Sequence, residues 1–370
     1  MTREIEVKTE RLQELMAAEN LDGILLNSQH NFAWITAGAD NGVDRSRENG
    51  VASILITRKG RRFLLSNNIE MPRLTAEQVT DVGFEPVEFS WQAERSSPAF
   101  LVEKASQIAG GKIATDIPLH AAARPLESNI ARCRYQLTPE ERSRYRDLGQ
   151  DAAAAMSDCI SRTMPGETEV SIAAGLRRDL ALKGIDSIVT LVAGDSRIDK
   201  FRHPVPTNAR WTAKLMLVTC AKRSGLVASL SRIVHVGAVP PELKERTEAA
   251  AYVFASLLNA TREGVSGSQL YRTAREAYAY AGFPLEIDKH HQGGATGYRT
   301  REWVAHPESM ETVRPDQAFA WNPSAAGTKV EETAIAGSGA CEVITASPGF
   351  PLITHTIDGA EYDSPGILEI

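Results

Sequence analysis

No long apolar run and no block of like charges occurs anywhere in the 370 residues. A membrane-spanning helix needs about 20 apolar residues in succession, and the charged N-terminus MTREIEVKTE lacks the apolar core of a signal peptide. The formal net charge of -6 comes without the basic stripe that binds nucleic acid. We therefore expect a cytoplasmic protein that binds neither a membrane nor a nucleic acid.

Cysteine is also scarce. Cys133, Cys159, Cys220 and Cys341 form no Cys-x-x-Cys pair and have no histidine at zinc-binding spacing. We expect them to be reduced, because free cysteine is among the most buried residue types. Hydrophobic residues make up 42% of the chain and charged residues 24%, as in ordinary globular proteins, and the length favours two domains.

The first third of the chain alternates patterns that are typical of helices and of strands. An amphipathic helix precedes the short apolar run GILL at 23–26. The segment VASILITRKGRRFLLSNN (51–68) predicts two strands joined by a turn at Lys59 and Gly60. This alternation indicates an α/β domain.

A strong helix start signal near residue 138 indicates where a second domain begins. In QLTPEERSRY (136–145), Thr138 can cap a helix, Pro139 fits its first turn, and Glu141 completes a capping box. Periodicity alone predicts an α+β domain from there on. Besides the helix that follows Thr138, further helices are expected around 172–180, 241–262 and 267–281.

Three segments of the second domain resemble motifs of the pita-bread superfamily, which includes creatinase, prolidase and aminopeptidase P. They are KLMLVTCAKRSGLVASLSRIVHVG (214–237), HHQGGATGYRTRE (290–302) and AFAWNPSAAGTKVEETAIAG (318–337). The resemblance implies a C-terminal pita-bread catalytic domain at 136–370 and a smaller creatinase/prolidase-like α/β domain at 1–135. It also implies a homodimer.

The resemblance further indicates where metal ligands are missing. Metal-dependent members supply two Asp, one His and two Glu to a pair of divalent ions, and this chain retains only Glu331. Hard divalent cations need several anionic oxygens or imidazoles in one shell. We therefore expect no metal cofactor at this position. The other ligand positions hold Val218, or Thr219 if the register slips by one, Ser229, Gly294 and Asn322.

The polar residues that remain suggest acid–base chemistry. His203, in VAGDSRIDKFRHPVPT, matches the principal acid/base histidine of the metal-free creatinase, and histidine titrates near operating pH. An unpaired, partly buried carboxylate at Glu331 would have a raised pKa and could activate water. Asn322 and His290 would polarise the substrate.

Arg301, Glu302 and His291 are the expected substrate-binding residues. A guanidinium grips a carboxylate in a fixed fork, which makes Arg301 the candidate for anchoring an acidic group. Glu302 completes an Arg-Glu pair like that of creatinase. Adjacent side chains of an extended chain point to opposite sides, so we expect only one of His290 and His291 to face the site, with His290 favoured.

These residues predict a metal-independent hydrolase of a C–N bond in a small carboxylate-bearing molecule, such as an amidine, a ureido compound, a lactam or a small amide. A metal-dependent Xaa-Pro dipeptidase or aminopeptidase is one alternative. A ligand-binding protein without catalysis is another. A separate metal site is a further idea, because Asp195, Asp199 and His203 are spaced four apart and would share one face of a helix.

Overall fold

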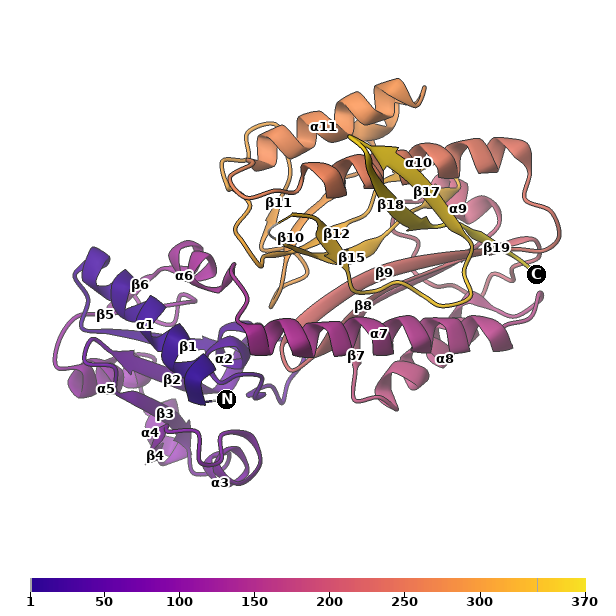
Figure 1. Ribbon diagram of the computed structural model, residues 1–370. Coiled ribbons are helices and arrows are strands. Elements are labelled where there is room, and N and C mark those ends of the chain that lie inside the picture. Colours follow the sequence, from indigo (N-terminus) through magenta and orange to yellow (C-terminus); the bar gives the residue numbers. More distant parts are fainter. Residues whose placement is uncertain (1, 338) are drawn as a thin grey trace. The chain divides into compact units, whose positions relative to one another are not determined.

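A computed structural model describes residues 2–337 and 339–370 of the chain, which divides into two compact units, Met1–Tyr135 and Gln136–Ile370 (Figure 1). Both units combine helices with strands. The predicted α+β class with an α/β N-terminal part is therefore confirmed.

The N-terminal unit is built on a six-stranded sheet of order β4-β3-β2-β1-β5-β6. The predicted hairpin is confirmed, since β2 and β3 pair antiparallel with Ile56 opposite Arg62, and Gly60 takes a φ of +76° in the turn. Its elements are α1 (Thr2–Glu19), β1 (Gly23–Ser28), α2 (Gln29–Ile35), β2 (Asn49–Thr57), β3 (Arg62–Asn67), α3 (Met71–Arg73), the π-helical turn η1 (Leu74–Gln78), β4 (Glu85–Phe89), α4 (Trp91–Ser96), α5 (Phe100–Ala109), β5 (Ile113–Thr115), β6 (Arg124–Pro125) and α6 (Glu127–Arg134).

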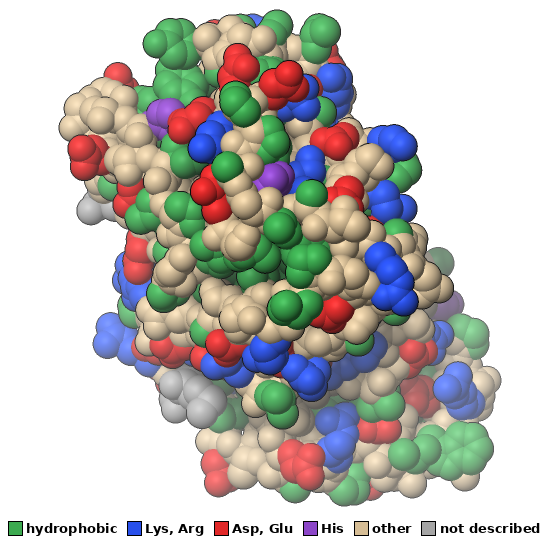
Figure 2. Space-filling model, turned by 90° about the vertical axis from the view of Figure 1, so that its right-hand side faces the viewer, with side chains coloured by type: hydrophobic (Ala, Val, Ile, Leu, Met, Phe, Trp, Pro, Cys, Tyr) green, Lys and Arg blue, Asp and Glu red, His purple; other side chains and the backbone are tan. Residues whose placement is uncertain are grey.

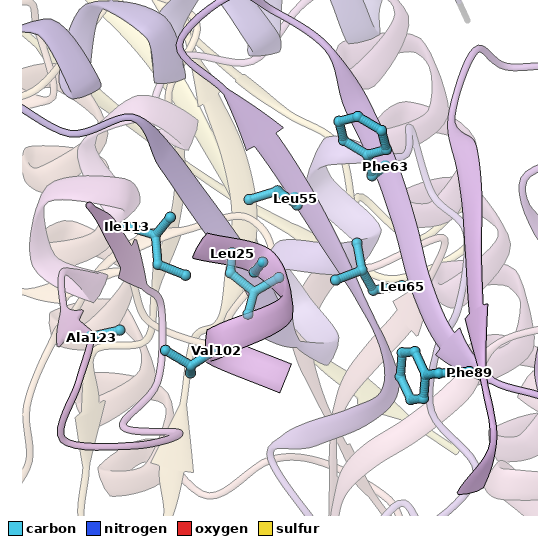
Figure 3. Close-up of a cluster of buried hydrophobic side chains, with 9 residues drawn as sticks. Leu25, Leu55, Phe63, Leu65, Phe89, Val102, Ile113 and Ala123 are labelled. Carbon is cyan, nitrogen blue, oxygen red and sulfur yellow. The ribbon is translucent and has the colours of Figure 1, made fainter. Parts of the chain in front are cut away.

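One face of this sheet forms a hydrophobic core with α5 (Figure 3). Leu25 of β1, Leu55 of β2 and Leu65 of β3 are fully buried there. Val102 packs against them from α5. Burying each such side chain stabilises the fold by roughly 1.5–3 kcal/mol. Because successive side chains of a strand point to opposite faces of the sheet, α5 covers the face on which these apolar side chains lie.

A polar network in the same unit makes its stability depend on pH. The carboxylate of Glu127 lies 3.0 Å from His30 Nε2 and accepts hydrogen bonds from Asn31 Nδ2 at 2.7 Å and Arg134 Nη2 at 2.7 Å. Burial alone would raise the pKa of Glu127, but the hydrogen bond with His30 and the charge of Arg134 outweigh burial and lower it from 4.5 to about 2.

We expect the N-terminal unit to lose stability as the pH falls from about 4.5 to about 2. Because the folded-state pKa of Glu127 is depressed, its contribution is fully present above the unfolded-state value and disappears as the carboxylate is protonated. The shift corresponds to on the order of 3 kcal/mol. Urea unfolding of wild type and Glu127→Gln at several pH values would check this, and an equally steep acid loss in both would contradict it.

The C-terminal unit contains a four-stranded sheet of order β19-β9-β8-β7 and a five-stranded sheet of order β11-β10-β12-β15-β16. Its elements are α7 (Pro139–Arg162), α8 (Glu169–Ala181), β7 (Asp186–Gly194), α9 (Ser196–Lys200), β8 (Lys214–Arg223), β9 (Leu226–His235), α10 (Pro241–Ala260), α11 (Gly267–Tyr280), the 3₁₀ turn η2 (Pro284–Asp288), β10 (Gly293–Thr296), β11 (Trp303–Val304), β12 (Ala318–Trp321), β13 (Ser324–Ala325), β14 (Thr328–Lys329), β15 (Glu332–Ala336), β16 (Cys341–Val343), β17 (Leu352–Ile357), β18 (Ala360–Pro365) and β19 (Ile367–Glu369).

Two pairs of helices lie on opposite sides of the strands in this unit. Figure 1 shows α7 and α8 on one side and α10 and α11 on the other. The predicted capping box of α7 is confirmed, because Glu141 N donates to Thr138 Oγ1 at 3.2 Å and Thr138 N donates to Glu141 Oε2 at 2.7 Å. The other predicted helices are confirmed as α8, α10 and α11.

The surface carries charges of both signs, and the cysteines form no disulfide within the described residues. Figure 2 shows cationic and anionic side chains interspersed over the face in view. Within the described ranges, no helix combines the length and the apolar character needed to cross a membrane. All four cysteines are free, and Cys159 and Cys220 are buried.

Candidate functional site

A cluster of charged and imidazole side chains forms in the C-terminal unit, and we call it the charged cluster. Three short segments supply it: the loop after α9, the loop between η2 and β10, and strand β14 with the turn that joins it to β15. A fourth contribution comes from the loop between β10 and β11. Its members are His203, His290, His291, Arg301, Lys329 and Glu331.

Buried ion pairs and hydrogen bonds hold these segments together. Arg202, beside His203, forms an ion pair with Glu286 of η2, and its Nη1 donates to Ser324 Oγ at 3.2 Å. The backbone N–H of Ser231 in β9 donates to the carbonyl of Glu331 at 3.2 Å. The loop that carries His203 is therefore fixed against the segment that leads to His290.

All three histidines converge. His203 Nε2 lies 3.0 Å from His290 Nε2, so one ring donates a hydrogen bond to the other. The rings of His290 and His291 stack with centroids 4.5 Å apart and an interplanar angle of 25°. The prediction that only one of them faces the site is wrong, because the chain bends at His290 instead of continuing as an extended strand.

Burial and nearby positive charge keep these rings neutral. Burial first and the charge of Lys329 second lower the pKa of His290 to about 2. Burial and Arg301 lower the pKa of His291 to about 4. Burial and Lys329 lower the pKa of His203 from 6.5, although Glu331 opposes this shift. Each ring therefore offers one lone pair and one N–H at neutral pH.

Glu331 is paired, so the expectation of an unpaired carboxylate is wrong. Its Oε2 lies 2.8 Å from Lys329 Nζ, and its Oε1 lies 3.9 Å from Arg301 Nη2. Lys329 is 5% and Glu331 3% exposed. Glu331 Oε2 nevertheless lacks a well-directed hydrogen bond among the described atoms, so the contact with Lys329 is chiefly electrostatic. Arg301, Lys329 and Glu331 together leave one net positive charge.

Most of the remaining positions at which the resemblance implies metal ligands are engaged in other contacts or have no side chain. Val218 packs in an apolar cluster with Met216 and Ile233. The hydroxyl of Thr219 lies 2.9 Å from Ser187 Oγ of β7. Neither residue can hold an ion beside Glu331.

Ser229 and Gly294 offer no free ligand atom to an ion either. Ser229 lies opposite Cys220 in the β8–β9 hairpin and donates a hydrogen bond to Cys220 Sγ at 3.3 Å. A Cβ added to Gly294 would lie 2.2 Å from the carbonyl oxygen of Trp303, so no side chain fits there. Histidine cannot be restored at this position without moving the sheet.

The two divalent ions that the resemblance implies therefore do not fit. One carboxylate remains, and an ammonium group already neutralises it at 2.8 Å. A pair of divalent ions needs several anionic ligands. Here the net positive charge of Arg301, Lys329 and Glu331 would instead repel the ions.

Several buried polar atoms of the site have no hydrogen-bond partner within the described part of the chain. Asn322, directly after β12, is 2% exposed, and its Oδ1 is such an atom. His290 Nδ1 and Arg301 Nε are two more. The backbone N–H of Asn322 donates to the carbonyl of Gln292, two residues after His290. Because an unsatisfied buried polar group costs about 1–3 kcal/mol, unpartnered polar atoms in neighbouring segments are typical of a ligand site.

Other predicted residues lie elsewhere. Asp195 precedes the five-residue helix α9 and accepts hydrogen bonds from the N–H groups of the 212–214 segment, while Asp199 pairs with Lys214 at 2.9 Å. The proposed metal site of Asp195, Asp199 and His203 is therefore wrong. Glu302 lies near Tyr145, where burial raises the pKa of the tyrosine, a hydrogen bond with Thr296 opposes this shift, and the charge of Glu302 adds a smaller rise.

Sequence reasoning missed Lys329 and Cys220. Lys329 stands two residues before Glu331 in TKVEET, a spacing that places both side chains on one face of an extended chain. Cys220 sits at the margin of the cluster, where burial first and the charge of Glu331 second raise the pKa of its thiol. This cysteine is therefore a neutral thiol and not a nucleophile.

The C-terminal unit also holds a pocket of about 480 Å³ away from the cluster. Its lining is mostly apolar and includes Ile160, Met164, Phe350 and Leu368. No histidine, aspartate, glutamate, lysine or arginine lines it. This pocket therefore offers no side chain for acid–base chemistry.

Comparisons with known proteins agree with this fold. Residues 143–344 match the model of metallopeptidase family M24, and residues 8–123 match that of the creatinase/prolidase N-terminal domain. Over 251 residues the chain is 24% identical to a Xaa-Pro dipeptidase of Lactobacillus helveticus, a match that covers 65% of this chain and 66% of that protein. The match thus spans just under two thirds of that relative.

Solved structures are similar over nearly the whole chain. A Xaa-Pro dipeptidase from Bacillus anthracis superposes with a TM-score of 0.75 and 20% identity, covering 93% of this chain and 98% of the other. A dipeptidase from Pyrococcus horikoshii gives 0.77 and 17%, with 92% and 98% covered. At these identities the likeness concerns the fold alone, and the predicted pita-bread resemblance is confirmed by the two family models that match.

Proposed function

The chain belongs to metallopeptidase family M24, a family of hydrolases of peptide C–N bonds, and we propose that it cleaves a C–N bond in a small carboxylate-bearing substrate without ions at the family's dinuclear position. The observation that carries this proposal is the buried ion pair of Lys329 and Glu331, because Glu331 stands at a position where the resemblance implies a metal ligand. A fixed ammonium group there supplies positive charge that an ion would otherwise supply.

The cations of the cluster suit a carboxylate substrate. The side chain of Arg301 is 15% exposed, and its Nε has no partner among the described residues. Its Nη1 donates to the carbonyl of Thr300 at 2.6 Å, and the contact of its Nη2 with Glu331 at 3.9 Å is too long for a hydrogen bond, so Nε and Nη2 are the donors available to another carboxylate. Fork-shaped recognition of a carboxylate is the usual role of such an arginine.

The histidine pair supplies proton transfer. In the 3.0 Å contact one Nε2 carries a proton and the other offers a lone pair. One ring can accept the proton of an attacking water as the C–O bond forms, while the other protonates the leaving nitrogen as the C–N bond breaks. His203 is the exposed member of the pair and His290 the partly buried one.

Asn322 orients the substrate. Because its amide oxygen is the unpartnered atom, we assign it to accept a hydrogen bond from a substrate N–H, with its amide nitrogen available to a substrate oxygen. Glu331 holds Lys329 in position through their ion pair, and this role replaces the water activation expected from an unpaired carboxylate. His291 supports His290 by stacking.

The rate acceleration that these groups can supply limits which substrates the site can cleave. General acid and base groups contribute about 10² to 10⁴ each, and one oriented hydrogen-bond donor about 10² to 10³. Their product lies in the lower part of the enzymatic range of about 10⁶ to 10¹⁷. Small amides, lactams, amidines and ureido compounds that carry a carboxylate are therefore the substrates to test first.

A Xaa-Pro dipeptidase is the second candidate. The relative from Lactobacillus helveticus and the solved structure from Bacillus anthracis both carry this name, which favours a dipeptide substrate. A Xaa-Pro dipeptide is itself small and carries a carboxylate, so the two candidates differ chiefly in their need for ions.

A substrate screen in the presence of a chelator separates the candidates. We expect at least one small carboxylate-bearing amide or dipeptide to be hydrolysed at an undiminished rate when the chelator is in excess. Hydrolysis that requires an added divalent ion would favour the conventional dipeptidase. Saturable binding without product would instead leave the chain a ligand-binding protein.

Replacing Arg301 tests the substrate anchor. We expect Arg301→Ala to raise KM by about 10- to 100-fold with a smaller change in kcat, because a charge-assisted hydrogen bond contributes about 1.5–3 kcal/mol. Arg301→Lys should recover only part of this loss, since an ammonium group lacks the fork. Steady-state kinetics on the substrate found in the screen would check it. An unchanged KM in Arg301→Ala would remove Arg301 from substrate binding.

A further inference from the structure

We propose that His203, His290 and His291 form a binding site for one late first-row transition-metal ion, with Zn²⁺ or Co²⁺ as the fitting class. This site is different from the family's dinuclear position, where the resemblance implies Glu331 as the one retained ligand and where Glu331 is paired with Lys329. The binding claim stands on the geometry of the three imidazoles and does not depend on the proposed hydrolysis.

The geometry of the three rings is close to that of a coordinated ion. One nitrogen from each ring lies within 4.8 Å of the other two. Two ligands of a tetrahedral Zn²⁺, each about 2.0–2.1 Å from the ion, lie about 3.3 Å apart. The 3.0 Å between His203 Nε2 and His290 Nε2 already approaches this separation, while the nitrogen of His291, within 4.8 Å of the other two, has to move closer on binding.

An ion that binds between the two Nε2 atoms replaces the hydrogen bond that joins them. His290 Nδ1 is buried without a partner within the described part of the chain and can take up the proton of that bond. Three imidazoles with an open fourth position are a known ligand set for Zn²⁺. On binding, the ring whose Nε2 carries the shared proton shifts that proton to Nδ1, so two lone pairs face the ion and no proton is lost.

The nearby cations decide which ions can bind. Lys329 and Arg301 act electrostatically on His203 and His291, so they also repel a dication. Ions that prefer oxygen ligands, such as Mg²⁺ and Mn²⁺, gain little from imidazole and should not bind. Ions with a strong preference for imidazole can bind against this repulsion, and binding should tighten when the charge of Lys329 is removed.

A bound ion would inhibit the proposed reaction. It would occupy the nitrogen lone pairs of His203 and His290 that transfer protons, and only this consequence rests on the proposed function. Zinc would thus inhibit this protein, whereas the metal ion of a metal-activated peptidase is required for activity.

Titration of the untagged full-length protein with Co²⁺, followed by the visible absorption of the ion, tests the proposal. We expect one equivalent to bind with a low-symmetry spectrum, and Zn²⁺ to displace it. His291→Asn and His203→Asn should each weaken binding about 100-fold or more, since loss of even an outer-shell partner costs 10- to 100-fold. Lys329→Met should tighten binding. His306→Asn, which changes an exposed histidine outside the cluster, is the matched control.

Equal Co²⁺ affinity in wild type and in the His203 and His291 variants would overturn the proposal, as would weaker binding in Lys329→Met. Far-UV circular dichroism of each variant shows whether the fold is retained. The titration does not use turnover, so binding of Co²⁺ without any detectable hydrolysis would refute the proposed function and leave the metal site standing.

Discussion

Replacing His203 with alanine is expected to lower kcat by about 10² to 10⁴, because the substitution removes one member of the proton-transferring pair. The side chain is exposed and lies in a loop that the ion pair of Arg202 and Glu286 holds in place, so the fold should be unaffected. Turnover of the substrate found in the screen, measured beside thermal unfolding, checks this expectation.

Two further results sharpen the test of His203. His203→Asn should also be inactive, since an amide cannot take up a proton at neutral pH. Imidazole added to His203→Ala should restore part of the rate. Unchanged turnover in both variants would remove His203 from the mechanism.

Replacing Lys329 with methionine is the second substitution with a large expected effect. It leaves the buried carboxylate of Glu331 without its close ionic partner, and breaking a buried pair in this way costs about 3–5 kcal/mol of stability. It also removes a positive charge from the site, so turnover should fall severely. Equilibrium urea unfolding and steady-state kinetics measure the two effects.

A double variant separates stability from function. Lys329→Met combined with Glu331→Leu removes both charges, and replacement of a whole buried pair by apolar groups is often close to neutral. We expect the double variant to regain most of the lost stability and none of the activity. If Lys329→Met alone were as stable as wild type, the pair would not be the buried ionic contact described here.

Local features of the chain were predictable because local contacts determine them. Thr138 and Glu141 bond each other across three residues, and the hairpin around Gly60 needs only a turn between two apolar runs. The sequence showed that Gly294 stands at the position of a missing ligand. The reason why a side chain is excluded there is a contact with another strand, which the sequence does not show. The carbonyl of Trp303 from the paired strand β11 occupies the space of a side chain.

Misjudged features depend on contacts between distant segments. The bend at His290 aligns two adjacent rings that an extended chain would separate. Asp199 pairs with Lys214 of β8, a contact that no helical spacing reveals. Lysine and glutamate two residues apart are usually solvated, and only the fold shows that Lys329 and Glu331 are buried together.

The central claim is that Lys329 and not a pair of ions balances the charge of Glu331. A crystal grown with millimolar Mn²⁺, with data collected to record anomalous scattering from manganese, tests it most directly. We predict no anomalous peak within about 2.6 Å of the Glu331 carboxylate, the upper limit for a hard cation bound to oxygen, and an ammonium group still beside it. Two peaks bridged by Glu331, with Lys329 displaced, would contradict the account and restore a conventional metallopeptidase.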